Sequence, residues 1–316
     1  MIFIRRPQTD PFFNLAAEEY FLKNSREDVL MVWQNKPSVV VGKHQNVLAE
    51  VNMDFVSENN FPVIRRISGG GTVYHDMGNI NLTRISTSQK TDRLVDFREF
   101  TRPVVDFLKQ FGLEVAFEGK NNLTVNGKKF SGNSAHVFKN SVMHHGTFLY
   151  QSDLNRLEKV IHPGNSHIVD KSIKSVRATV GNIAGFMEKP VTTEVFRRHL
   201  EQFLVGYYHI HTVAEVTPEE KLAIEKLVQE KYSRWEWNRG YSPKYIVEGD
   251  RNTEYGKFHV SLKVKEGKIT DIALFFEGKK LEKTEQKILG QKHDKVHLRK
   301  VLANNHFSEV IINTLF

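Results

Sequence analysis

Residues 65–76 read RRISGGGTVYHD, and this stretch decides how the chain folds and where its chemistry lies. VIRR (63–66) and TVYH (72–75) are strand-like, and SGGGT (68–72) joins them. Three consecutive glycines remove the β-carbons from one edge of the loop, so backbone N–H groups can approach an anion closely. The run matches neither the P-loop nor the dinucleotide-binding pattern, and turn propensity alone equally allows a plain flexible hairpin. The adjacent arginines favour an anion site, but strand alternation lets only one of Arg65 and Arg66 reach the loop's ligand.

Outward from this stretch, strand-like and helix-like segments alternate irregularly. Asp10-Pro11 is typical of a helix start and precedes an amphipathic segment to about residue 24, while Asn126-Gly127 predicts a two-residue hairpin. Strands are expected at 29–33, 37–42, 63–66, 72–75, 79–85, 115–117, 123–125, 128–132 and 143–150. Helices are expected at 53–60, 92–112, 192–208 and 217–232, with Pro103 as a boundary or kink. Because several neighbouring strands are joined by hairpins, we expect an α+β fold with a large mixed sheet rather than a doubly wound one.

The segment SRWEWNRGYSPKY (233–245) interrupts the pattern with interleaved aromatic, polar, Gly and Pro residues. We therefore expect two domains, a large catalytic one at 1–242 and a smaller α+β one at 243–316. The second should hold a hairpin turning near Glu266-Gly267, followed by helices at about 279–289, 294–303 and 306–316.

Composition narrows the class of protein. Of 316 residues, 40% are hydrophobic and 26% charged, which is ordinary for a globular chain. No apolar run is long enough for a membrane span, and the start lacks a signal peptide, so we expect a soluble cytoplasmic protein with no membrane partner. There is no cysteine, which excludes disulfides, thiolate metal sites and a cysteine nucleophile. The net charge of +8 favours an acidic partner, but no run of like charges suggests nucleic-acid binding.

Lys129 is the strongest single candidate for chemistry. It follows the Asn126-Gly127 turn on a strand, where alternation separates it from Lys128. A strand-borne ammonium could neutralise a carboxylate and a phosphate together while a mixed anhydride forms. A solvated hairpin lysine is the alternative reading.

The neighbouring His144 and His145 invite a metal reading. Consecutive strand residues point apart, so the two should not share an ion. We predict no metal site built from protein ligands alone.

Taken together, these segments resemble the lipoate–protein ligase family. The matching stretches are FFNLAAEEY (12–20), VVVGKHQN (39–46), RRISGGGTVYHDMGNINLT (65–83), GKNNLTV (119–125), GKKFSGNSA (127–135), HHGTFL (144–149), SVRATVGNI (175–183) and WEWNRG (235–240). They cover nearly the whole chain in order, so the resemblance implies the biotin/lipoate ligase type of fold and argues against the plain hairpin.

The resemblance implies two ATP-dependent steps, formation of lipoyl-AMP with release of pyrophosphate and then amide formation with a lysine of an acceptor domain. Carried over residue by residue, the nucleotide contacts are Arg66, Gly71, Thr72, Val73, Tyr74 and Lys129. The contacts to lipoate are Lys129, Gly70, His145, Gly146, Trp33 and His44. Lys129 would hold the carboxylate against the α-phosphate as the catalytic residue.

The resemblance also implies partners and a metal. The acceptors would be lipoyl domains of 2-oxo-acid dehydrogenase acyltransferase subunits and the glycine-cleavage H protein, which are typically acidic. Mg²⁺ would accompany the nucleotide near Asn121 and Asn122. The family usually has Gly-Arg-Asn-Asp-Leu where residues 119–123 read GKNNL, so an amide stands where a carboxylate is expected, and an amide is a poorer magnesium ligand.

Two alternatives stay open. The first is an ATP-independent octanoyl or lipoyl transferase, or a lipoyl amidotransferase, of the same fold; the lack of cysteine argues against the cysteine-dependent transferases, while Asn122 suits an amidotransferase. The second is a non-catalytic module that binds lipoyl domains, which should have lost the activating residues. Biotin ligases share the broad fold, but their Gly-Arg-Gly-Arg-type loop is absent.

Overall fold

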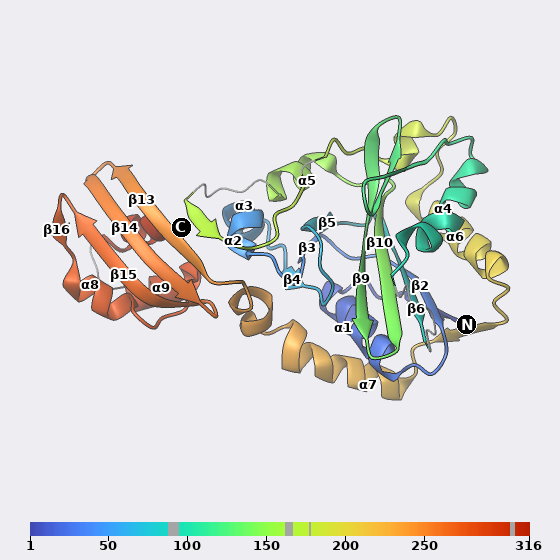
Figure 1. Ribbon diagram of the computed structural model, residues 1–316, viewed down its shortest axis with the longest axis horizontal. Coiled ribbons are helices and arrows are strands. Elements are labelled where there is room, and N and C mark those ends of the chain that lie inside the picture. The colour runs from blue at the N-terminus through green and yellow to red at the C-terminus, as the bar shows by residue number, and fades with distance from the viewer. Residues whose placement is uncertain (88–94, 162–166, 177, 304–306) are drawn as a thin grey trace.

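The computed structural model describes residues 1–87, 95–161, 167–176, 178–303 and 307–316. A large part and a small part lie side by side along the molecule's long axis (Figure 1). None of the helices in these ranges has the length and apolar character needed to cross a membrane.

The large part is organised around an eight-stranded sheet. Its strands, in order, are β12 (Thr212–Glu215), β1 (Ile2–Arg5), β2 (Val29–Trp33), β6 (Asn79–Ser86), β10 (Ser141–Leu149), β9 (Lys128–Phe138), β8 (Asn122–Val125) and β7 (Ala116–Glu118). β1 runs parallel to both of its neighbours, and the remaining pairs are antiparallel. The predicted mixed α+β architecture is therefore confirmed, although β1 and β12 at the sheet edge were not predicted.

A second, three-stranded sheet carries the triglycine loop. β3 (Ser38–Val41) is its central strand, parallel to β4 (Val63–Arg65) and antiparallel to β5 (Val73–His75). Because β4 and β5 lie on opposite sides of β3, residues 66–72 cross the end of β3 and do not form a tight hairpin. The hairpin reading of SGGGT was wrong for this reason.

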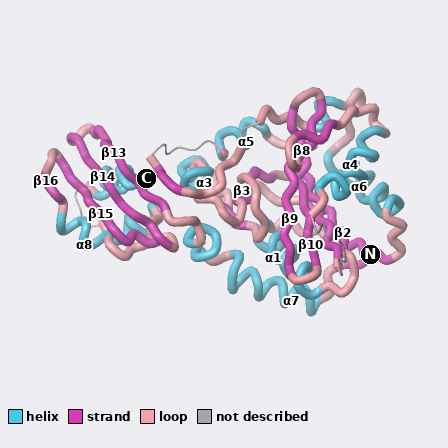
Figure 2. Tube along the Cα trace, in the orientation of Figure 1, coloured by secondary structure: helices cyan, strands magenta, loops and turns pink. Residues whose placement is uncertain are grey.

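Helices cover both faces of the large sheet (Figure 2). They are α1 (Pro11–Asn24), α4 (Phe97–Lys109), α6 (Thr193–Tyr207) and α7 (Pro218–Leu227), which continues as the π-helical η2 (Val228–Tyr232). Short helices α2 (Val47–Glu50), α3 (Met53–Glu58), α5 (Leu154–Val160), η1 (Ile183–Phe186) and η3 (Glu236–Gly240) connect the strands. As predicted, Asp10 caps α1 by accepting from the Phe13 backbone N–H, with Pro11 in the first turn.

Successive side chains of β6 point to opposite faces of the large sheet, so the strand contributes to two separate cores. Ile80 and Leu82 point into a core shared with α4 and α6, whereas Ile85 joins the core under α1. Pro103 does not end α4, because the helix runs through it and Pro103 itself is buried. Residues 92–94, where this helix was expected to begin, lie outside the described residues.

The two predicted hairpin turns occur as expected. Asn126 and Gly127 have φ of 51° and 71°, and Glu266 and Gly267 have φ of 51° and 70°. Positive φ at both central residues is what a two-residue type I′ turn requires.

The small part has its own apolar core. Its sheet comprises β13 (Tyr245–Thr253), β14 (Gly256–Lys265), β15 (Lys268–Phe276) and β16 (Lys279–Lys280), and its helices are α8 (Glu282–Ile288), α9 (Lys295–Val301) and α10 (Ser308–Leu315). Residue 306, the expected start of the last helix, lies outside the described residues. The chain's earlier strand β11 (Ile168–Asp170) pairs with β13, so the sheet of the small part also includes residues from before the predicted boundary at 242/243.

Candidate functional site

A cavity of about 440 Å³ runs across the large sheet on the face that α1 covers. Five of its lining residues are successive cross-strand partners, one from each of β2, β6, β10, β9 and β8: Trp33, Asn81, Thr147, Gly132 and Asn122. Four strand spacings correspond to roughly 19 Å. The cavity is therefore a tunnel that begins at buried Trp33 and ends at part-exposed Asn122, with Lys120 and Lys174 exposed beside that end.

A second cavity, of about 530 Å³, adjoins the first. Tyr74 lines only this one, with apolar residues such as Leu149, Leu154 and Val180. Thr72, Val73 and Lys129 line both. The predicted nucleotide and acyl residues therefore fall into two joined cavities, except His44, which is exposed and lines neither.

The two arginines of the opening motif lie on opposite faces, as alternation predicted. The Arg66 guanidinium donates to the carbonyls of Gly69 and Gly71 at 2.6 and 2.7 Å and lines the tunnel. Gly70 between them has φ of +86°, a conformation that L side chains rarely adopt. Burial lowers the pKa of Arg66 to about 10, which still leaves it charged at neutral pH. Arg66 thus holds the shape of the glycine loop and adds a fixed positive charge behind it.

Arg65 has a different task. It is fully buried and donates to carbonyls of Gly42, Gln45 and Asn238 and to the Ser242 hydroxyl. These bonds tie the loop after β3 to the segment leading into the small part.

Lys129 lies at the junction of the two cavities. Gly132 lies beside it, and the site leaves little room for a side chain there, because a Cβ would lie 3.3 Å from the Lys129 ammonium. The ammonium has no ion pair or hydrogen bond within the described ranges, and burial lowers its pKa. Lys128 is exposed on the other face of the strand and lines neither cavity. The solvated-hairpin reading therefore fits Lys128 and not Lys129.

The charges around the tunnel are one-sided. Its lining includes four cations, Arg66, Lys120, Lys129 and Lys174, and no carboxylate among the described residues. Lys174 pairs with Asp170 outside the tunnel, at 2.8 Å. A site of this kind attracts an anion with several negative charges.

One wall of the junction comes from residues 173–176, opposite the glycine loop. The Ser175 hydroxyl accepts from the Thr72 backbone N–H at 3.0 Å and from the Gln45 amide at 3.1 Å, and donates to Glu50. Gln45 and Ser175 lie in stretches that resemble the family, but no role was predicted for either residue. Arg177, two residues after Ser175, lies outside the described residues.

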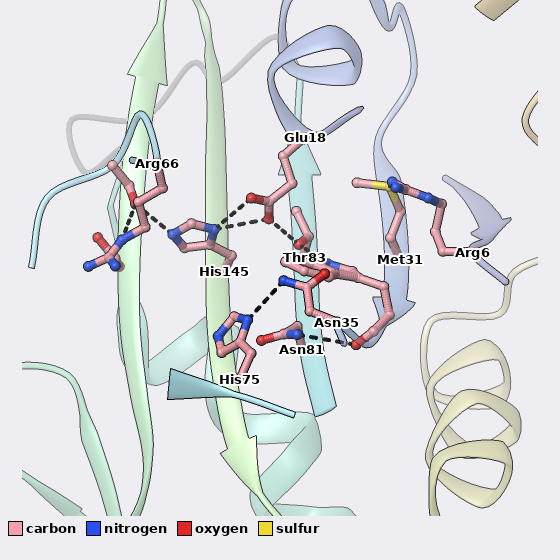
Figure 3. Close-up of polar contacts among 12 residues, drawn as sticks. Arg6, Glu18, Met31, Asn35, Arg66, His75, Asn81, Thr83 and His145 are labelled. Carbon is pink, nitrogen blue, oxygen red and sulfur yellow. Dashed lines mark hydrogen bonds and ion pairs between the residues drawn. The ribbon is translucent and has the colours of Figure 1, made fainter. Parts of the chain in front are cut away.

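His145 on β10 lines the tunnel and is held by hydrogen bonds on both ring nitrogens (Figure 3). Its Nδ1 lies 2.9 Å from a Glu18 carboxylate oxygen, and its Nε2 lies 2.6 Å from the Ser68 hydroxyl. His144 points to the opposite face and stacks on Phe100, so the two histidines point apart as predicted. Glu18 was missed by sequence reasoning, although a carboxylate on the core-facing side of a helix was the available signal.

Asn121 and Asn122 lie near the open end. Asn121 exchanges hydrogen bonds with Asn133, while Asn122 on β8 faces the tunnel. Within the part of the chain that the structure describes, no cluster of three or more His, Asp or Glu residues could hold a metal ion.

Comparisons with known proteins agree with this geometry. Residues 10–205 match the family model of the lipoyl protein ligase A/B catalytic domain, and residues 242–315 match the bacterial lipoate protein ligase C-terminus. Lipoate-protein ligase LplJ of Bacillus subtilis is 37% identical over 280 residues, covering 87% of this chain and 84% of that protein. A lipoate-protein ligase A solved with ATP is 25% identical with a TM-score of 0.64, covering 76% of this chain and 98% of that one. A two-part archaeal lipoate protein ligase from Thermoplasma acidophilum, studied with its E2 lipoyl domain, is 24% identical with a TM-score of 0.65, covering 76% and 96%.

Proposed function

This chain belongs to the lipoate–protein ligase family, and from that premise we propose that its two joined cavities activate lipoate with ATP and then pass the lipoyl group to a lysine of an acceptor protein. The observation that carries the proposal is the position of Lys129, which lines both cavities and has no ion pair among the described residues. An ammonium at this junction can touch an acyl carboxylate on one side and a phosphate on the other.

Lipoate lies in the tunnel in this proposal. Its carboxylate is at Lys129, its chain passes Gly70, His145 and Gly146, and its ring reaches Trp33. The buried lining at the Trp33 end suits the apolar chain, and the part-exposed end at Lys129 suits the carboxylate.

ATP takes the second cavity and the junction. The adenosine lies among apolar residues near Tyr74 and Val73, and the phosphates lie against the glycine loop at Gly71 and Thr72. Arg66, Lys120 and Lys129 supply positive charge there. Support comes from the related ligase A solved with ATP.

The chemistry is two nucleophilic displacements. First, a carboxylate oxygen of lipoate attacks the α-phosphorus of ATP, and the bond to pyrophosphate breaks. Lys129 holds the two anions together and stabilises the charge that builds up between them. Second, the neutral amine of an acceptor lysine attacks the acyl carbon, AMP leaves, and the amine loses a proton to form the amide.

Magnesium arrives with the nucleotide in this scheme. Asn121 and Asn122 offer only amide oxygens, and no carboxylate lines the tunnel within the described residues. An amide is a weaker magnesium ligand than a carboxylate, so the ion depends on the phosphates of ATP for most of its binding.

The acceptors we propose are lipoyl domains of 2-oxo-acid dehydrogenase acyltransferase subunits and the glycine-cleavage H protein. The net charge of +8 favours acidic acceptors, and the archaeal relative was studied with an E2 lipoyl domain. Since the reaction consumes ATP, the proposal includes a cytoplasmic location.

The test mixes purified protein with lipoate, ATP, Mg²⁺ and an apo lipoyl domain. We expect pyrophosphate release and a mass increase of one lipoyl group on the acceptor. A second candidate, a lipoyl amidotransferase, is favoured by Asn122 alone. Lipoylation that needs an acylated carrier protein and consumes no ATP would overturn the ligase proposal in favour of that candidate.

A further inference from the structure

The closed end of the tunnel contains a polar side chain that the reaction does not use. His75 is 3% exposed, lines the tunnel and lies edge-on to Trp33, with ring centroids 6.1 Å apart. Asn81, the cross-strand partner of Trp33, lines the same end. An end built only to hold a hydrocarbon chain needs no such groups.

A chain of hydrogen bonds decides which ring nitrogen of His75 has the proton. Arg6 can only donate, and it donates to the Asn14 side-chain oxygen at 2.5 Å. The Asn14 amide nitrogen must then be the donor to Asn35 Oδ1, at 2.8 Å. That in turn leaves the Asn35 amide nitrogen to donate to His75 Nδ1, at 3.0 Å. Nδ1 is therefore an acceptor, and the proton of the neutral ring is on Nε2.

The ring is neutral because of its surroundings. Burial, with the charges of Arg66 and His145 nearby, lowers the pKa of His75 to about 3. Nε2 has no hydrogen-bond partner among the described residues. Unlike a fully buried atom, it keeps a small exposed area. Because His75 lines the tunnel, we place this N–H towards the tunnel.

We infer that His75, held in one tautomer by Arg6, Asn14 and Asn35, is a specificity residue that selects acyl chains ending in a sulfur-containing ring over purely hydrocarbon chains. This inference rests on the proposed function and names the substrate feature that the closed end recognises. Sulfur is a weak acceptor for the Nε2 proton and a polarisable neighbour for the Trp33 ring. A methyl or methylene group at the same place leaves a buried donor without a partner.

The experiment compares lipoate with 5-cyclopentylpentanoate, in which methylene groups replace both sulfurs of the same ring. For each acid, kcat/KM for pyrophosphate release is measured in the natural protein, His75→Phe and His75→Gln. Phe removes the donor, whereas the Gln amide can place an N–H close to the position of Nε2. His136→Phe, on β9 outside both cavities, is the matched control.

We expect the natural protein and the control to prefer lipoate. In His75→Phe that preference should fall by about three- to tenfold, the size of one net hydrogen bond. His75→Gln should recover most of it. An unchanged preference in His75→Phe would overturn the inference while pyrophosphate release from lipoate leaves the ligase proposal standing. Absence of pyrophosphate from the natural protein with either acid would instead count against the ligase proposal.

A second measurement needs no variant that must fold. Nitrogen-15 NMR of labelled histidines distinguishes the two tautomers, and His75 is expected to be neutral with its proton on Nε2 at neutral pH. Lipoate should shift this resonance more than the cyclopentyl acid does. A proton on Nδ1, a charged ring or equal shifts from both acids would contradict the inference.

Discussion

The two ends of the tunnel differ in how their polar groups are paired. The open end at Lys129 presents cations that have no carboxylate partner in the tunnel wall, so it can act on an anion. The closed end around Trp33, His75 and Glu18 is buried, and its polar groups bond mainly to one another. The cations of the open end can therefore act on the reacting groups, whereas the hydrogen-bonded polar groups of the closed end can hold and recognise the substrate. A substitution at the open end should therefore reduce activity, whereas one at the closed end should change stability or selectivity.

The largest expected effect is at the open end. Lys129→Ala should slow pyrophosphate formation roughly 100- to 1000-fold, because it removes the group that stabilises the charge developing in transfer. Its free energy of unfolding should stay within about 1 kcal/mol of the natural protein. Lys128→Ala, one residue away on the exposed face, is the control for both assays. Equal activity losses in the two variants would mean that the junction is not where the reaction occurs.

The next effect is at Glu18, whose carboxylate accepts from Thr83 and bonds to His145. Glu18→Ala leaves both partners buried without it and should lower the free energy of unfolding by about 2 kcal/mol. Urea denaturation measures this change, and Glu18→Gln, which keeps one acceptor oxygen, should lose less. If the Glu18→Ala protein were as stable as the natural one, the polar groups of the closed end would not have the stabilising role that we assign to them.

The effect of His75 on stability should appear only in acid. Unfolded His75 binds a proton below about pH 6.5, whereas the folded residue, with its pKa lowered to about 3, does not. The unfolded state therefore binds more protons in this window, and stability falls as pH drops from about 6.5 towards 3. His75→Gln removes this contribution, so its Tm should fall less steeply over the same range. Parallel Tm curves would indicate that His75 titrates alike in both states.

The smallest expected effect concerns Asn122 at the open end. Asn122→Asp adds a carboxylate where the tunnel has none and should reduce the Mg²⁺ concentration needed for half-maximal pyrophosphate release by a few-fold. Asn121→Asp is the neighbouring control, because its amide is already engaged with Asn133. If Asn122→Asp instead needs a higher Mg²⁺ concentration for half-maximal pyrophosphate release, the residue faces the phosphates and not the ion.

Much of this arrangement was predictable from sequence. Asp10-Pro11, Asn126-Gly127 and Glu266-Gly267 marked a helix start and two turns, because each depends on local backbone chemistry. Alternation separated Arg65 from Arg66 and His144 from His145. The edge strand β12 and its neighbour β1 were missed, since they pair with each other from residues 212–215 and 2–5, far apart in the sequence.

The closed end was out of reach for a related reason. His75, Asn35, Asn14 and Arg6 meet only after β2, β5 and α1 have packed, and no spacing in the sequence shows that they are neighbours. Lys129 and the glycine loop could be predicted from the sequence because each lies within a short motif. A hydrogen-bond chain that joins residues from several elements can be recognised only in the folded structure.

We propose that lipoate and ATP meet at Lys129 in two joined cavities. A single-turnover incubation of the protein in excess over lipoate, with ATP and Mg²⁺ and without any acceptor, tests this most directly. We predict that mass spectrometry will find lipoyl-AMP bound to the protein, one pyrophosphate released for each, and a lipoylated acceptor when an apo lipoyl domain is added afterwards. Lipoate recovered unchanged, with no pyrophosphate, would contradict the account.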